Sequence, residues 1–253
     1  GKRITTVLDY IKTTGALDYR LEDILFHGYH GVGCIEAGGP KPGVGCAGRG
    51  IITAFELLER FGVKEQYDLI LYDVLGDVVC GGFAVPIRRE YADTILLVTS
   101  GEYMSLYAAN NILRGVQNYD GDRCRVAGIL FNSRNVRDEG LRVERFAQAV
   151  GLPIFAKIPR DDVFARAERE NRTVVELREQ TDGRVAEIFD RIADKLIGQP
   201  PLYPARPLTD EALEELIFYG TSPGQRDAVA AEPEKSAPTA PVELDTPAYD
   251  AGY

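Results

Sequence analysis

Short apolar runs alternate with longer amphipathic stretches along most of this 253-residue chain. Residues 69–72, 95–98 and 126–131 form continuous apolar runs, and residues 154–158 form a weaker one. Runs of this length without a polar alternation are typical of strands that a parallel sheet buries on both faces. The pattern therefore predicts four buried parallel strands.

Helical patterns lie between these runs, at residues 51–61, 103–119 and 139–150. A late amphipathic helix is predicted from apolar residues at helical spacing, namely Val185, Ile188, Phe189, Ile192 and Leu196. Strands that alternate with helices indicate an α/β fold with a doubly wound, mostly parallel sheet. Ligands bind such sheets at the carboxyl ends of the strands.

The pattern changes after the late helix. Residues 1–198 are interpreted as one α/β domain, followed by a proline-rich connector and a short helix in residues 199–219. Thr209 is expected to cap that helix, which runs to about residue 218. Residues 220–253 are rich in proline, alanine and acidic residues without apolar periodicity, and we expect a disordered acidic tail.

Composition excludes several classes of function. The chain carries 29 basic and 39 acidic residues, for a net charge of −10, which argues against a nucleic-acid-binding protein. No apolar run is long enough for a membrane span, and no signal peptide opens the sequence, so no membrane is expected. Four scattered cysteines are too few for a secreted disulfide scaffold, and a cytoplasmic location is expected.

Two cysteines lie in glycine-rich loops: Cys46 within GVGCAGRG and Cys80 within DVLGDVVCGGF. Thiolates are soft ligands for iron, and glycine allows backbone N–H groups to approach the sulfur atoms of a cluster. A 4Fe–4S cluster takes four thiolates, so a homodimer with one cluster on its twofold axis would complete the set. Two buried free thiols are the alternative for Cys46 and Cys80.

Asp73 follows the apolar run 69–72, where a carboxylate can hold Mg²⁺ through water. In the D-x-x-G pattern that begins there, the Gly76 N–H is placed to sense a γ-phosphate, and Asp77 to polarise the attacking water. An ordinary turn or helix cap is the alternative for such an aspartate. We expect hydrolysis to move the short segment between Asp73 and Cys80.

Polar residues also follow the next two strands. Asn132 and Arg134 come after the run 126–131, and Pro159, Arg160 and Asp161 come after the run 154–158. A nucleotide base and ribose would lie at these strand ends. Polar strand-end caps are the alternative, because such short patterns are common.

The segments GGPKPGVGCAGRGIITAF and YDLILYDVLGDVVCGGFAVPIR resemble the iron protein of nitrogenase and its close relatives, from about residue 4 to about residue 216. The resemblance implies a P-loop NTPase fold, cluster ligands at Cys46 and Cys80, and Mg-ATP. It also implies that Arg49 corresponds to the arginine that some organisms ADP-ribosylate, on the docking face. The nucleotide contacts would be the strand-end residues given above.

By the same resemblance, the activity would be ATP-dependent transfer of single electrons to a larger metalloprotein of the nitrogenase type. A ferredoxin or flavodoxin would be the electron donor. Lys41 stands where many nitrogenase iron proteins have an acidic residue, so a related reductase that serves a different partner is an alternative. A positioning or partitioning ATPase of the same fold is the rival function, although it gives no reason for both cysteines.

One feature departs from the family. The sequence contains no G-x-x-x-x-G-K-[ST] phosphate loop, and Gly1-Lys2-Arg3 does not replace it. We therefore expect an N-terminally incomplete copy that lacks the first βαβ elements. A member that has lost ATP binding and a non-catalytic remnant are the alternatives.

The remaining candidate ligands are expected to be structural. Cys34 and Cys124 lie within or beside apolar stretches and are interpreted as buried free thiols. His27 and His30 flank a glycine in a loop and are interpreted as surface or packing residues.

Overall fold

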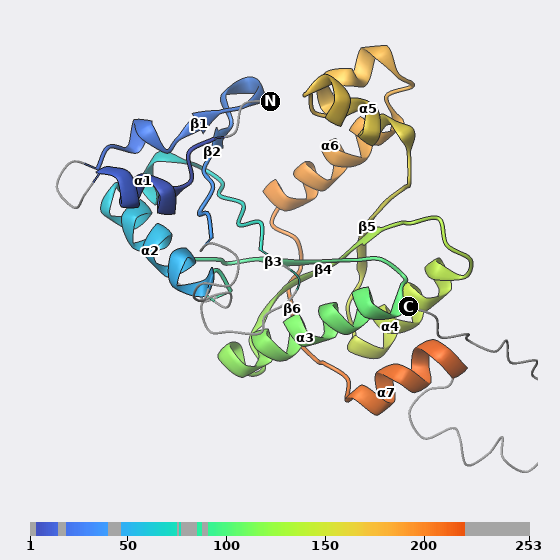
Figure 1. Ribbon diagram of the computed structural model, residues 1–253. Helices are drawn as coiled ribbons and strands as arrows, with labels where there is room; N and C mark the ends of the chain where they lie inside the picture. Colours follow the sequence, from blue (N-terminus) through green and yellow to red (C-terminus); the bar gives the residue numbers. More distant parts are fainter. Residues whose placement is uncertain are drawn as a thin grey trace, which may run out of the picture.

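The computed structural model describes residues 4–14, 19–39, 47–74, 76, 85–87 and 91–220, with the side chains of residues 47–49 excepted. Figure 1 shows a central sheet with helices on both faces and a group of shorter elements beside it.

The sheet consists of parallel strands in the order β3 (Ile95–Thr99), β4 (Cys124–Asn132) and β5 (Ile154–Ile158). A two-residue strand, β6 (Tyr203–Pro204), pairs antiparallel with the start of β4. The predicted strands at 95–98, 126–131 and 154–158 are confirmed. The central strand β4 is buried along most of its length, as its continuous apolar run predicts, whereas β3 and β5 are only partly buried.

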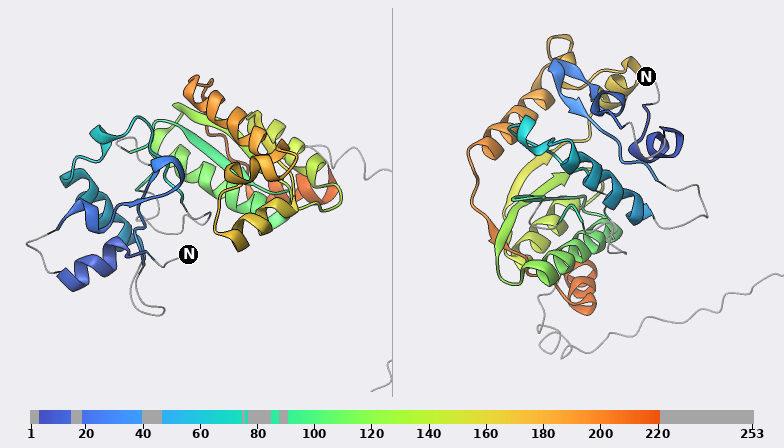
Figure 2. Two further views of the ribbon diagram at one scale, coloured as in Figure 1. Left: turned by 90° about the horizontal axis from the view of Figure 1, so that it is seen from above. Right: turned by 90° about the vertical axis from the view of Figure 1, so that its left-hand side faces the viewer.

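Helices α3 (Tyr103–Asp120) and α4 (Glu139–Val150) cover one face of the sheet, and α6 (Arg184–Ile197) covers the other (Figures 1 and 2). The core on the first face includes the fully buried side chains Leu97, Leu106, Leu113, Ile129 and Phe146. The core on the second face joins β4 and β5 to α6 through Ala127, Phe155 and Ile192. The predicted α/β fold with a mostly parallel sheet is confirmed.

Helix α7 (Asp210–Glu214) begins after Thr209, whose Oγ1 accepts a hydrogen bond from Ala212 N at 3.2 Å, as expected of a cap. It continues as a wider turn, η5 (Glu215–Tyr219), and buries Leu213, Leu216 and Ile217 against the first-face core. The helical segment that follows the proline-rich stretch is therefore packed on the sheet domain.

The other helices are α1 (Val7–Thr14), α2 (Ala47–Arg60) and α5 (Asp162–Glu170), with short turns η1 (Leu21–Asp23), η2 (Tyr29–Gly31), η3 (Lys64–Gln66) and η4 (Val175–Gln180). Strands β1 (Phe26–His27) and β2 (Gly33–Cys34) form a small antiparallel pair. Helices α1 and α2 share a separate core that includes Val7, Ile24 and Leu57. The helical pattern at 51–61 predicted α2, whereas α1, β1 and β2 are too short for the sequence pattern to reveal.

The prediction of a buried strand at residues 69–72 is wrong. This segment is not a strand, and the side chains of Leu69 and Leu71 are 59% and 76% exposed. A strand is buried only when a neighbour pairs with its backbone and other elements cover its faces. Among the described residues, β4 alone pairs with β3, and Val98 of β3 is 57% exposed. Residues 69–72 therefore pair with no strand in the described part of the sheet, and the side chains of Leu69 and Leu71 stay exposed.

The prediction that Cys34 and Cys124 are buried is also wrong, because both are free and exposed. Cys34 is the last residue of the two-stranded pair β1–β2, and Cys124 is the first residue of β4, before the buried residues of that strand. His27 and His30 are exposed, as expected of surface histidines.

Candidate functional site

The structure brings the strand-end residues of β4 and β5 together at the carboxyl edge of the sheet. Asn132 is paired in register with Ile158, and Ser133 N donates a hydrogen bond to Ile158 O at 2.9 Å. The polar segments that start at Asn132 and Pro159 are therefore neighbours, although 26 positions separate them along the chain. The side chains of Asn132, Arg134 and Arg160 are exposed at this edge.

The loop between β4 and α4 is built around one buried carboxylate. Glu139, at the start of α4, is 5% exposed and accepts hydrogen bonds from Ser133 Oγ, Arg134 N (3.0 Å) and Asn135 N (2.8 Å). Burial alone would raise the pKa of Glu139. The hydrogen bonds from Ser133 and from the backbone of the loop outweigh burial and lower its pKa below the ordinary value. The carboxylate is thus a charged anchor at neutral pH.

The loop between β3 and α3 lies against this one. Arg142 of α4 donates from Nε to Gly101 O at 2.6 Å. A Cβ atom on Gly101 would clash with the backbone oxygen of Glu139, so the close approach of the two loops requires glycine there. Arg134 Nε lies 4.0 Å from Glu102 Oε2, and both side chains are about half exposed. An anion at this edge would compete with Glu102 for the Arg134 guanidinium.

The third loop leads from β5 into α5. Asp161 caps α5 by accepting a hydrogen bond from Val163 N at 2.8 Å. It also lines a cavity of about 330 Å³ between α5, the segment that follows η4, and the start of α6. The polar lining of the cavity comprises Asp161, Asp162, Arg166, Arg169, Thr181 and Asp182, and Val163 and Val185 add apolar surface.

Two ion-pair arrangements involve residues that line this cavity. Arg166 donates to Glu170 Oε1 at 2.8 Å and to both the backbone oxygen (3.1 Å) and Oε1 (2.8 Å) of Gln180. Asp182 accepts hydrogen bonds from the backbone N (3.2 Å) and Nε (2.6 Å) of Arg184. These bonds, the backbone one first, lower the pKa of Asp182. The cavity therefore carries both fixed cations and fixed anions.

Sequence reasoning found Asp161 but missed the rest of the cavity. Asp162, Arg166 and Arg169 share one face of α5 at helical spacing, which could have been recognised as a polar face. Thr181 and Asp182 approach from a segment that no local pattern connects to α5.

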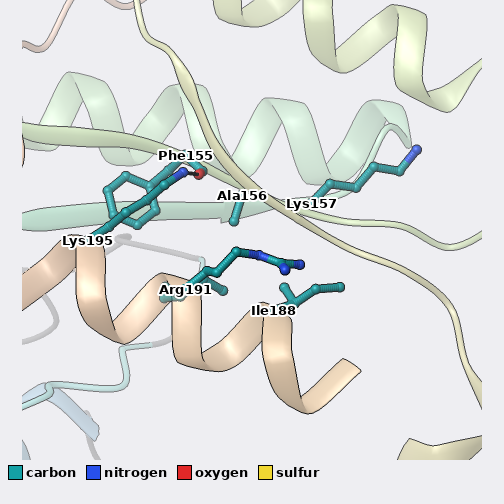
Figure 3. A pocket seen from close by; sticks show the side chains of 7 residues that line it. Phe155, Ala156, Lys157, Ile188, Arg191 and Lys195 are labelled. Atoms are coloured by element: carbon teal, nitrogen blue, oxygen red, sulfur yellow. Dashed lines mark hydrogen bonds between the residues drawn. The ribbon is translucent and has the colours of Figure 1, made fainter. Parts of the chain in front are cut away.

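A second cavity, of about 150 Å³, lies between β5 and α6 and is lined by apolar residues and three cations (Figure 3). Lys195 Nζ donates to Phe155 O at 2.7 Å, which fixes α6 on β5. Lys157 points away from Arg191 in Figure 3, and its Nζ lies 5.1 Å from the centre of the Phe131 ring. This cavity lies beside the body of β5 rather than at its carboxyl end, and its lysines serve packing.

The structure describes only some of the predicted cluster and switch residues. Cys46, Asp77 and Cys80 lie outside the described residues, as does the side chain of Arg49. Asp73 is exposed and forms no hydrogen bond or ion pair with another described residue, and Gly76 is exposed. Among the described residues, no hydrogen bond or ion pair joins Asp73 or Gly76 to Asn132 or Asp161, whereas the strand-end residues of β4 and β5 lie together.

The described part of the chain contains no group of three or more His, Cys, Asp or Glu side chains that could hold a metal ion. Cys34 and Cys124 therefore belong to no such group. The same part of the chain has no helix with the length and hydropathy needed to cross a bilayer.

A parallel sheet with helices on both faces, and with polar loops and a cavity at its carboxyl end, defines a doubly wound α/β protein with a candidate ligand site at that edge. Comparison with known families identifies the family of this chain. Residues 1–221 match the family described as 4Fe-4S iron sulfur cluster binding proteins, NifH/frxC family. The chain belongs to this family.

Curated relatives agree. The chain is 48% identical over 219 residues to a nitrogenase iron protein of Methanospirillum hungatei, a match that covers 85% of this chain and 77% of the relative. It is 44% identical to nitrogenase iron protein 2 of Methanothermobacter thermautotrophicus, covering 86% of this chain and 80% of the relative. A nitrogenase iron protein of Methanococcus voltae is 39% identical, with coverages of 85% and 77%. The resemblance inferred from the cysteine loops is confirmed.

Proposed function

We propose that this protein is the reductase component of a nitrogenase or nitrogenase-like system, which passes single electrons to a larger metalloprotein in an ATP-dependent reaction. The observation that carries the proposal is the family match over residues 1–221, which includes both cysteine loops, together with relatives named nitrogenase iron proteins. A homodimer, and a ferredoxin or flavodoxin as electron donor, complete the proposal.

The cluster ligands in this proposal are Cys46 and Cys80. Two thiolates per chain, each flanked by glycines, suit one 4Fe–4S cluster shared by two chains, and such a cluster supplies one-electron chemistry when bound. The flanking glycines allow the backbone N–H groups to stabilise negative charge on sulfur. Within the described residues, Cys34 and Cys124 belong to no group of three or more metal-binding side chains.

The nucleotide is proposed to bind at the carboxyl edge of β4 and β5. Asn132 and the segment from Pro159 to Asp161 are neighbours there, and the Arg134 guanidinium is available to an anion. The cavity beside Asp161, of about 330 Å³, falls in the range of small-molecule sites and offers both hydrogen-bonding groups and apolar surface to a base and ribose.

The remaining roles are proposals for the cysteine-loop side of the protein. Asp73 would hold Mg²⁺ through water, Gly76 would sense the γ-phosphate, and Asp77 would polarise the attacking water. Arg49 would lie on the docking face, where its planar guanidinium suits a bidentate pair with a partner carboxylate.

Anaerobic purification with an iron assay and electron paramagnetic resonance tests the proposal. We expect about four irons per dimer and the signal of a reduced 4Fe–4S cluster. Cys46→Ala or Cys80→Ala should abolish iron binding, because a cluster that loses two thiolates per dimer cannot be held. The matched controls are Cys34→Ala and Cys124→Ala, which alter exposed thiols and should leave iron content unchanged.

A full complement of iron in Cys46→Ala would refute the ligand assignment. An iron-free wild-type protein that still dimerises with nucleotide would instead favour a positioning or partitioning ATPase.

A further inference from the structure

Glu139 is a buried carboxylate to which sequence analysis assigned no role. It is 5% exposed, and its acceptor oxygens serve the loop that follows β4 rather than a neighbouring cation. Oε1 accepts from Ser133 Oγ and from Asn135 N at 2.8 Å, and Oε2 accepts from Arg134 N at 3.0 Å. Both carboxylate oxygens therefore bind the backbone on either side of the Arg134 side chain.

The loop that Glu139 holds contains two residues with positive φ. Asn135 and Asp138 have φ angles of 61° and 60°, in the left-handed region, which asparagine and aspartate adopt more readily than other non-glycine residues. A loop of this shape needs a constraint from its surroundings to stay in one conformation. The three hydrogen bonds to Glu139 supply that constraint from inside the loop.

Neighbouring elements leave the loop little freedom on its other side. The backbone of Glu139 lies so close to Gly101 that a Cβ atom there would sit 2.5 Å from the Glu139 Cβ. Arg142, one turn along α4, donates to both Gly101 O (2.6 Å) and Arg137 O (3.1 Å). Glu139 thus holds the loop after β4 from within, and its backbone and Arg142 lie against the loop after β3.

We propose that Glu139 is a positioning residue for the nucleotide: its carboxylate holds the backbone of Arg134 and Asn135 so that Asn132 and Arg134 face the ligand. This inference rests on the proposed function, because it assumes that a nucleotide binds at this edge. A carboxylate in the first turn of a helix also stabilises the helix itself, so a loss of stability alone does not distinguish the two roles.

The experiment uses the full chain labelled with ¹⁵N, with ADP as the probe. ADP is titrated while the amide resonances are followed, and hydrogen exchange of the Arg134 and Asn135 amides is measured without ligand. Glu139→Gln replaces one acceptor oxygen with an N–H donor that faces another donor. We expect it to weaken ADP affinity about tenfold and to accelerate exchange of at least one of the two amides by a similar factor.

The control is Glu144→Gln, which neutralises an exposed carboxylate on the same helix. It should change neither ADP affinity nor the exchange of the two amides. Ser133→Ala serves as a second variant if Glu139→Gln does not fold. It removes one donor, leaves the carboxylate in place, and should weaken ADP affinity about threefold.

Unchanged ADP affinity in a folded Glu139→Gln protein, or in Ser133→Ala, would overturn the positioning role while leaving the nucleotide proposal intact. Absence of a shift at the ends of β4 and β5 with ADP up to about 10 mM, both in the wild type and in a protein fused to the phosphate-loop segment of a relative, would overturn the nucleotide site itself, and the positioning role with it.

Discussion

The buried guanidinium of Arg125 forms an ion pair whose removal should lower the free energy of unfolding by an amount that can be estimated. Its side chain is 7% exposed and that of Asp120 is 4% exposed. Arg125 Nε donates to Asp120 Oδ2 at 2.6 Å, and its terminal nitrogens donate to the backbone oxygens of Ala92 and Ile87, each at 2.5 Å. One side chain of β4 thus fixes the end of α3 and the segment that leads into β3.

Arg125→Met keeps much of the side-chain volume but leaves the Asp120 carboxylate buried without its Arg125 partner and removes the Arg125 donors from two carbonyl oxygens. Removing one partner of a buried ion pair costs about 3–5 kcal/mol of the free energy of unfolding. Asp120→Asn keeps an oxygen acceptor and both carbonyl contacts, so it should cost less, about 1–3 kcal/mol. The order of the two variants follows from the number of buried groups left unpaired.

Urea denaturation of the wild type and the two variants, followed by circular dichroism, measures these differences through the midpoint at constant slope. The matched control is Arg123→Met, because Arg123 is exposed and lies two positions earlier on the way into β4. It should change stability by about 0.5 kcal/mol or less. A loss below about 1 kcal/mol in Arg125→Met would refute the reasoning, because it would mean that burying the Asp120 carboxylate without its cationic partner costs little free energy.

Three further predictions concern pH, nucleotide and docking. The folded-state pKa of Glu139 is lowered, so its stabilising contribution is complete above its ordinary pKa and is lost as pH falls through the folded-state pKa. The wild type should therefore lose more stability than Glu139→Gln between pH 6 and pH 3. Equal losses in thermal melts of the two proteins would contradict this prediction. Because the chain contains no G-x-x-x-x-G-K-[ST], it should hydrolyse Mg-ATP negligibly, and fusing the phosphate-loop segment of a relative should restore turnover; robust phosphate release by the unextended chain would show the reasoning to be wrong. In that fused protein, Arg49→Glu should retain iron and basal ATPase but lose partner-dependent electron transfer, and undiminished transfer would exclude a docking role.

Local patterns in the sequence determined the main elements of the sheet domain. The helix at residues 139–150 was predicted at its observed bounds, and the strand at 154–158 likewise, because apolar periodicity and run length report directly on burial. The Thr209 cap was also readable, since capping depends on residues three positions apart. Family membership followed from the two cysteine loops, whose glycine and cysteine spacing is distinctive.

Tertiary structure decided what depends on partners distant in the chain. Residues 69–72 look like a buried strand, yet Leu69 and Leu71 are exposed, because burial requires neighbouring strands that a local run cannot specify. Cys34 and Cys124 are exposed for the related reason that they stand at the ends of strands.

The candidate site shows the same division. Asn132, Arg134 and Asp161 were predicted because they directly follow strands, and parallel strands place their carboxyl ends at one edge. Thr181 and Asp182 of the cavity, Glu139 in the loop and Arg125 in its buried pair have no such local signal. Their roles arise from hydrogen bonds and close approaches that exist only after the sheet, α4, α5 and η4 have packed, since burial turns an ordinary charged side chain into one that must be paired.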